Sequence, residues 1–281
     1  GLTERWLLDY KDELKGVEKD LSNDIRRSIF KVVRESGEYA VLPDITLFKE
    51  VLPKAKFDPG PHFKTMFSQV PTDVLEAIMK GDLYKDGRGL SSRIWSATND
   101  FGNSIDYMIK KAIIEKKSAL ALAKDLEQFV KDPAKRSFNW GTVYPNMRSK
   151  KIDFNAQRLA RTSITHAFRE SQYRSAQRNP FVEAIHWQLS AEHYYRQVMR
   201  WGEDICDEYA RQNDYGLGAG NFPKGEVPLG HPCCLCVTYG VIVKSTDEVA
   251  EELRDWIHGG DNEVLDEWYS KFGQFYATKS A

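Results

Sequence analysis

His231-Pro232-Cys233-Cys234-Leu235-Cys236 is the stretch that decides how the second half of this chain folds. It holds three of the protein's four cysteines, and the fourth is Cys206. Chance would spread so rare a residue along 281 positions, so the cluster requires a local cause. Metal ligation and a small disulfide staple are the two candidates.

Two segments of partly alternating polar and apolar residues flank this block. They cover residues 182–189 and residues 237–243, and such alternation is typical of β-strands. The cysteine block lies between them in sequence. We therefore expect a short antiparallel sheet near residues 182–189 and 237–243 to carry it.

The rest of the chain has the periodicity of amphipathic helices, with apolar residues three or four positions apart. Residues 1–33 are expected to form one long helix that ends at Ser36-Gly37. Prolines and a glycine in residues 41–62 predict a connector of short turns. Further helices are expected near residues 90–112, 118–130, 153–179 and 246–275.

These patterns predict a mostly α protein with a small α+β C-terminal module and an elongated helical N-terminal region. We expect an N-terminal helical region with a Pro-rich connector over residues 1–85. A second domain covers residues 86–245, and residues 246–281 form an amphipathic helical segment. No apolar run approaches the roughly 20 residues that cross a bilayer, so no membrane partner is expected.

The cysteine spacing suits a metal ion. Zinc prefers four nitrogen or sulfur ligands in a tetrahedron. Cys234 and Cys236 are two positions apart, so on an extended strand their side chains share a face. Packing of small apolar side chains and a redox-sensitive disulfide are the alternatives. The predicted ligand set is Cys206, His231, Cys234 and Cys236, with His193 as a substitute.

Charge is distributed unevenly along the chain. The net charge is −1, yet residues 131–178 contain eleven Lys and Arg against three acids. Basic residues at helical spacing can follow the phosphates of DNA, and a solvated helix face is the alternative. The predicted DNA-binding residues are Arg148, Lys150, Lys151, Arg158, Arg161 and Arg169.

Five motifs follow one another in the second half of the chain. They are RLARTSITHAFR (158–169), WQLSAEH (187–193), DICDEYA (204–210), GLGAG (216–220) and VPLGHPCCLC (227–236). This ordered series resembles phage minor head proteins of the Mu F-like family, and the resemblance covers about residues 90–245. Many relatives carry a second cysteine two or three residues after the first, where this chain has Glu208 and Tyr209. The resemblance makes the portal protein of the phage head a second candidate partner for the predicted DNA-binding residues.

The resemblance implies a virion protein: a minor capsid component of a tailed phage, present in few copies near the portal vertex inside the head. Its partners would be the portal protein during procapsid assembly, scaffolding or other head proteins, and double-stranded DNA during packaging and ejection. Before assembly it would reside in the host cytoplasm.

Enzymatic chemistry has little support in the sequence. The glycine-rich loop at 216–220 lacks the Lys-Ser/Thr of a phosphate-binding loop, and turn flexibility explains it better. Acids beside a metal could activate water, so a metal-dependent nuclease or toxin-like enzyme is one alternative. A zinc-containing DNA-binding module is the other. We expect a structural, non-enzymatic protein.

Overall fold

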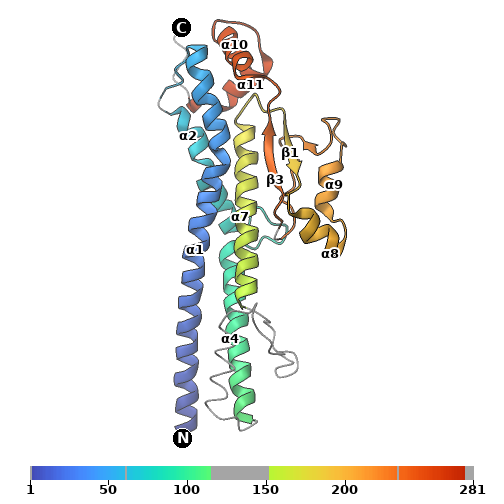
Figure 1. Ribbon diagram of the computed structural model, residues 1–281. Helices are drawn as coiled ribbons and strands as arrows, with labels where there is room; N and C mark the ends of the chain where they lie inside the picture. Colours follow the sequence, from blue (N-terminus) through green and yellow to red (C-terminus); the bar gives the residue numbers. More distant parts are fainter. Residues whose placement is uncertain (1, 61, 115–151, 233, 276–281) are drawn as a thin grey trace. The chain divides into compact units, whose positions relative to one another are not determined.

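The structure is a computed structural model that describes residues 2–60, 62–114, 152–232 and 234–275 (Figure 1). It is mostly helical and contains a small three-stranded antiparallel sheet, so the predicted fold class is confirmed. The helix expected near residues 118–130 lies outside the described residues. Among those that are described, no helix is long and apolar enough to cross a membrane.

The first half is made of helices and the second half mixes helices with the sheet. The first group is α1 (Leu2–Ala55), α2 (Phe63–Ser68), α3 (Val70–Lys80), α4 (Leu90–Ile114) and α7 (Ile152–Gln177). The second is β1 (Ala184–Gln188), the π-helical turn η2 (Tyr194–Val198), α8 (Met199–Trp201), α9 (Ile205–Arg211), β2 (Asn221–Phe222), β3 (Val237–Val241), α10 (Thr246–Ile257), α11 (Glu263–Phe272) and η3 (Gly273–Phe275).

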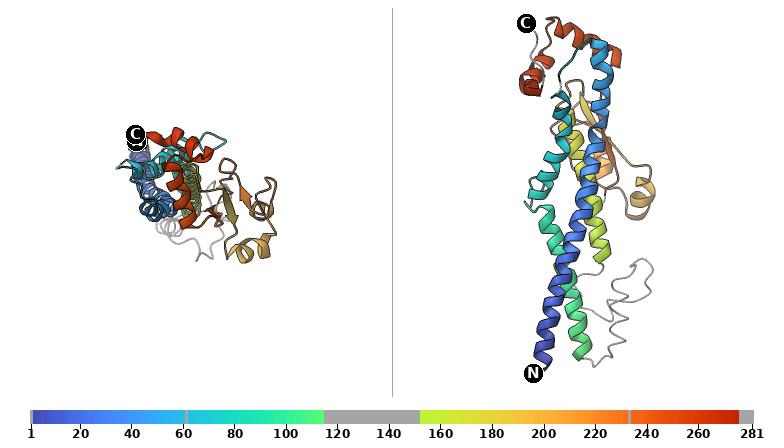
Figure 2. Two further views of the ribbon diagram at one scale, coloured as in Figure 1. Left: turned by 90° about the horizontal axis from the view of Figure 1, so that it is seen from above. Right: turned by 90° about the vertical axis from the view of Figure 1, so that its left-hand side faces the viewer.

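Two compact units are interleaved along the chain. Unit 1 combines residues 1–31 with 78–161, and unit 2 combines residues 32–77 with 162–281. In unit 1, α4 runs beside the first part of α1 (Figures 1 and 2). A side chain at Gly102 would collide with Glu18, so glycine permits this close approach. Ile94 and Met108 are buried on α4, as its periodicity predicts.

Helix α1 is longer than the sequence predicted. The predicted end at Ser36-Gly37 and the connector over 41–62 are wrong, because α1 continues to Ala55 with Pro43 and Pro53 inside it. Tertiary packing outweighs the local breakers, as it often does. Apart from the adjacent pair Ala40 and Val41, the buried positions of α1 past residue 28 are three or four residues apart. They are Ile29, Val33, Gly37, Ala40, Val41, Asp44, Phe48, Val51 and Ala55.

The main core of unit 2 lies between the C-terminal part of α1, the short helix α2 and the C-terminal helices α10 and α11. Phe48 stacks on Trp268 with ring centroids 6.1 Å apart. The single helix expected over 246–275 is divided into α10 and α11. Asn262 begins α11, because its side chain accepts a hydrogen bond from the Leu265 amide. The break folds Trp256 and Trp268 into one cluster.

A buried carboxylate joins α1 to the end of α7. Asp44 Oδ1 accepts a hydrogen bond of 2.7 Å from Asn179 Nδ2, and Oδ2 accepts one from Ser175. Lys224 donates to the Asn179 carbonyl over 2.8 Å. Burial raises the pKa of Asp44 above its ordinary value, and it lowers the pKa of Lys224. This network holds the second half of α1 against the C-terminal end of α7.

Replacing Asp44 with alanine should therefore destabilise the protein. The change removes the acceptor of two buried donors, Ser175 Oγ and Asn179 Nδ2, which costs about 1–3 kcal/mol per group left unpaired. Urea denaturation followed by tryptophan fluorescence measures the loss. Asp24→Ala is the matched control, because Asp24 is exposed on the same helix and should change stability by less than about 0.5 kcal/mol. Equal effects of the two substitutions would rule out the network's role.

Candidate metal centre

The register of the sheet brings distant parts of the chain together. β1 lies between β2 and β3, and Gln188 at its end pairs with Val237 at the start of β3. Residues that follow β1 and residues that precede β3 therefore meet at the same end of the sheet. His193 is among the residues that follow β1, and Cys234 and Cys236 are among those that precede β3.

The third segment of the site is the start of α9 (Ile205–Arg211). Asp204 is its N-cap, and its Oδ1 accepts a hydrogen bond of 2.8 Å from the Cys206 amide. Asp207 completes a capping box, since its Oδ2 accepts the Asp204 amide over 2.9 Å. The acids of the DICD motif thus hold the helix start that carries Cys206.

Three sulfurs converge in the interior. Cys206, Cys234 and Cys236 are each at most 3% exposed, and they pack against Trp187 and Phe222. The Sγ atoms of Cys206 and Cys234 are 3.4 Å apart, whereas a disulfide needs about 2.05 Å, so these cysteines are free thiols. Cys206, His231 and Cys234 each place a ligand atom within 4.8 Å of the other two. The cluster is close enough to hold a metal ion.

Two histidines and two aspartates border the sulfurs. His193 Nε2 lies 2.9 Å from Asp207 Oδ2, and its Nδ1 lies 3.8 Å from Cys236 Sγ. His231 Nε2 lies 3.2 Å from Asp204 Oδ2. The four predicted ligands and the substitute His193 are therefore all found in one place.

Arg169 is the buried partner of this cluster. Its Nη2 donates to Cys234 Sγ over 2.9 Å and to the Cys236 carbonyl over 2.5 Å, while Nη1 donates to the Leu229 carbonyl. The guanidinium carbon lies 4.3 Å from the ring centroid of Trp187. Arg169 is only 2% exposed. Its predicted place on a DNA- or portal-binding surface is wrong, because its donors face the cysteine loop.

The thiols of the cluster differ in acidity. Hydrogen bonds from Cys206 and Cys236, and then the charge of Arg169, hold the pKa of Cys234 well below its ordinary value. The same thiol hydrogen bonds, together with burial, raise the pKa of Cys206. The cluster therefore favours a thiolate at Cys234, and a thiolate is the form that ligates metals.

The structure describes the side chain of only one of the other predicted DNA- or portal-binding residues. Arg161 is exposed on α7, and Arg158 lies on the same helix without a described side chain. Arg148, Lys150 and Lys151 lie outside the described residues. The glycine loop forms a turn before β2 in which Gly216, Gly218 and Gly220 have positive φ angles, as a turn role requires.

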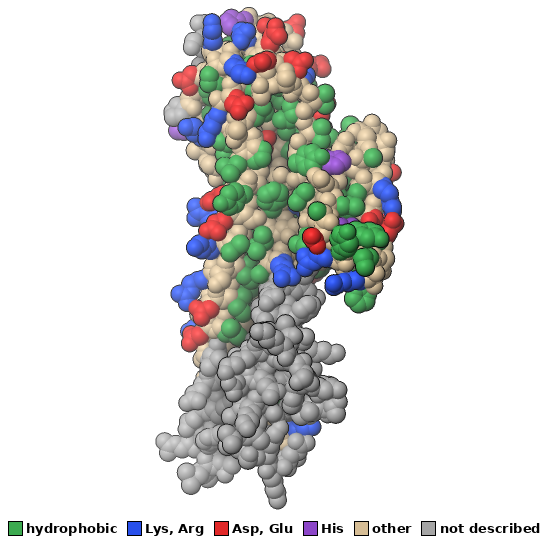
Figure 3. All heavy atoms as spheres, viewed as in Figure 1, with side chains coloured by type: hydrophobic (Ala, Val, Ile, Leu, Met, Phe, Trp, Pro, Cys, Tyr) green, Lys and Arg blue, Asp and Glu red, His purple; other side chains and the backbone are tan. Residues whose placement is uncertain are grey.

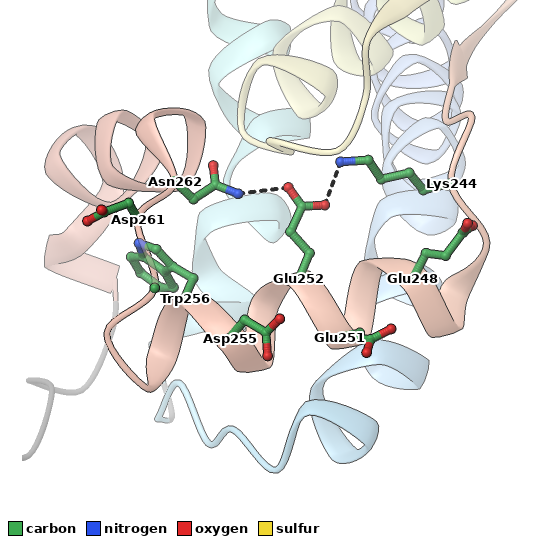
Figure 4. A pocket seen from close by; sticks show the side chains of 9 residues that line it. Lys244, Glu248, Glu251, Glu252, Asp255, Trp256, Asp261 and Asn262 are labelled. Carbon is green, nitrogen blue, oxygen red and sulfur yellow. Dashed lines mark hydrogen bonds and ion pairs between the residues drawn. The ribbon is translucent and has the colours of Figure 1, made fainter.

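A surface hollow lies elsewhere in unit 2. Its volume is about 390 Å³, and it lies along α10 (Figure 4). Glu252 accepts hydrogen bonds there from Lys244 over 2.5 Å and from Asn262 over 2.8 Å. These bonds tie α10 to the chain before and after it, so we interpret this surface as structural.

Comparison with known proteins gives no relative. No family model matches the chain, and neither a curated protein nor a solved structure is significantly similar to it.

Gly230 tests how closely the cysteine loop is packed. Its φ is +83°, and an added Cβ would lie 2.1 Å from Arg169 Nη1 and 3.0 Å from Trp187. Gly230→Ala should therefore lower the unfolding free energy by about 2–4 kcal/mol, the sum of left-handed strain and overpacking. Gly216→Ala is the matched control, since Gly216 has φ +68° but no atom near its Cβ position. Gly216→Ala should lower the unfolding free energy by about 1–2 kcal/mol, from left-handed strain alone. Equal losses for the two variants in thermal unfolding would contradict the close packing at Gly230.

Proposed function

We propose that this chain is a structural minor head protein of a tailed phage, which docks on the portal protein inside the head during assembly. The resemblance to the Mu F-like family is the basis, and one observation supports it. Four of the five motifs that carry the resemblance, though spread over residues 158–236, meet around one buried cluster. Arg169, Trp187, Cys206 and Cys234 come from four of these motifs.

We further propose that the cluster holds a structural zinc ion. Three buried sulfurs with neighbouring imidazoles form the donor set that zinc prefers. A structural site has four protein ligands and no open position, whereas a catalytic site leaves one position for water. The donors here are sufficient to close the site, so its role is to hold the loop before β3 to α7 and α9 rather than to catalyse a reaction.

An exposed aromatic surface is suited to docking on the portal. It comprises Tyr194, Tyr195, Met199 and Trp201 on η2 and α8, which are 57–79% exposed. Figure 3 shows hydrophobic side chains gathered over this part of unit 2, with Lys and Arg side chains at their border. Trp, Tyr, Met and Arg are the residues enriched in protein interfaces. We call this set the η2–α8 surface.

Co-sedimentation with assembled portal protein at low salt tests the docking proposal. The wild-type chain should sediment with the portal, and Trp201→Ala should reduce binding at least tenfold, as expected for an interface hot spot. Tyr39→Ala is the matched control, because Tyr39 is a comparably exposed aromatic residue on α1. Absence of binding by the wild-type chain would overturn the proposal, and equal binding of both variants would exclude the η2–α8 surface.

Contact with packaged DNA is a further part of the proposal. Arg161 is the predicted basic residue whose exposed side chain the structure describes. If the predicted basic residues bind phosphates, the logarithm of the affinity for DNA should fall linearly with the logarithm of the salt concentration. Removing one phosphate contact should lower the magnitude of this slope by about one. Filter binding of duplex DNA by the wild type and Arg161→Ala measures both slopes, and an unchanged slope would exclude Arg161.

A further inference from the structure

The three buried sulfurs leave one corner of a tetrahedron to be filled. A tetrahedral zinc ion with bonds of about 2.3 Å to sulfur sets neighbouring sulfurs about 3.8 Å apart. The Cys206 and Cys234 sulfurs are 3.4 Å apart, and Cys236 is hydrogen-bonded to both. Two histidines are candidates for the fourth ligand: His193, whose Nδ1 is 3.8 Å from Cys236 Sγ, and His231, which lies within 4.8 Å of the Cys206 and Cys234 sulfurs.

His193 has the geometry of a ligand. The expected sulfur–nitrogen separation across a tetrahedral zinc site is about 3.6 Å, and His193 Nδ1 lies 3.8 Å from Cys236 Sγ. Its other nitrogen, Nε2, lies 2.9 Å from Asp207 Oδ2. A proton on Nε2 that is donated to Asp207 leaves the Nδ1 lone pair directed at the sulfurs. Metal-bound histidines usually have such a carboxylate behind them.

His231 has its ring nitrogens directed elsewhere. His231 has a ring nitrogen within 4.8 Å of the Cys206 and Cys234 sulfurs, so it is close to a different pair of cysteines from the one that His193 approaches. His231 Nε2, however, is 3.2 Å from Asp204 Oδ2, and its Nδ1 is 2.8 Å from the Pro232 carbonyl. Its side chain is 35% exposed, against 8% for His193. Both of its nitrogens have oxygen partners.

We infer that Cys206, Cys234, Cys236 and His193 form a closed Cys3His zinc site, with Asp207 orienting His193 and Arg169 balancing the charge. The inference rests on the zinc ion of the proposed function. Three thiolates, a neutral imidazole and Zn²⁺ carry a net charge of −1. A buried charge is costly unless it is paired, and the guanidinium of Arg169 lies 2.9 Å from Cys234 Sγ. His231 then serves to hold Asp204 at the edge of the site.

Metal content of the full-length chain separates the two histidines. Zinc per chain is measured by elemental mass spectrometry, and the thiolate ligands are counted from the charge-transfer absorption of the Co²⁺-substituted protein. The wild type should bind one ion with three thiolates. His193→Ala should lose the zinc or bind it at least tenfold more weakly in a chelator competition, whereas the matched variant His231→Ala should retain it.

A milder variant tests the site even if His193→Ala fails to fold. Asp207→Asn keeps the size of the side chain and should weaken zinc binding about 10–100-fold without removing a ligand. Zinc lost from His231→Ala but kept by His193→Ala would overturn the ligand set while leaving the zinc proposal intact. A wild-type chain that binds neither zinc nor Co²⁺ would overturn both and leave docking on the portal standing.

Discussion

Replacing Arg169 with alanine should lower the free energy of unfolding by about 3–5 kcal/mol, the cost of leaving a buried charge without its partner. The substitution removes donors from the Leu229 and Cys236 carbonyls and from Cys234 Sγ. It also empties the space beside Trp187. Chemical denaturation followed by tryptophan fluorescence measures the change.

Two comparisons make this prediction specific. Arg169→Lys keeps the charge, but an ammonium lacks the planar fork that reaches three acceptors, so an intermediate loss is expected. Arg196→Ala removes an exposed arginine of η2 and should change stability by less than about 0.5 kcal/mol. A loss below about 1 kcal/mol for Arg169→Ala would show that this arginine does not hold the cysteine loop.

If the cysteine cluster holds zinc as proposed, a chelator should lower the melting temperature by an amount on the order of 10 °C. A ligand present at a thousand times its dissociation constant stabilises the folded state by about 4 kcal/mol, and each kcal/mol shifts a chain of this size by a few degrees. The buried thiols of Cys206, Cys234 and Cys236 should then react with a thiol reagent. Differential scanning fluorimetry and thiol titration report the two effects.

Add-back provides the control for chelation. Zn²⁺ should restore both the melting temperature and the protection of the thiols, whereas Mg²⁺ should restore neither, because it prefers oxygen ligands. A melting temperature that does not respond to the chelator, together with thiols that remain protected, would show that packing alone holds the cluster. That outcome corresponds to the apolar-packing alternative raised by the sequence.

Local periodicity was sufficient for much of the fold. Alternation at residues 182–189 and 237–243 predicted β1 and β3, and spacings of three and four predicted α4 and α7. It was insufficient for α1, where Gly37 and Pro43 suggested an end. Gly37 is in fact a contact point, since a Cβ there would lie 2.8 Å from Ser171 Oγ. Such a contact depends on a segment more than a hundred residues away, which local rules do not see.

The candidate metal centre could be predicted only in part, because local sequence rules do not show contacts between distant segments. Rarity and spacing of the cysteines predicted that Cys206 and Cys234 would meet. Helical spacing placed Arg169 on a stripe, but spacing alone does not say whether a stripe faces solvent or the interior. The pairing of His193 with Asp207 also required the register of the sheet. The signal that could have identified Asp207 is the spacing of Asp204 and Asp207, which is that of a capping box.

Mass spectrometry of purified phage particles tests the proposed role most directly. If the chain is the proposed minor head protein, particles of its phage, stripped of loosely bound protein, should yield its peptides in a few copies relative to the major capsid protein. The peptides should remain with the portal fraction when the heads are dissociated at low salt. Particles that contain the portal but never this polypeptide would contradict the proposal.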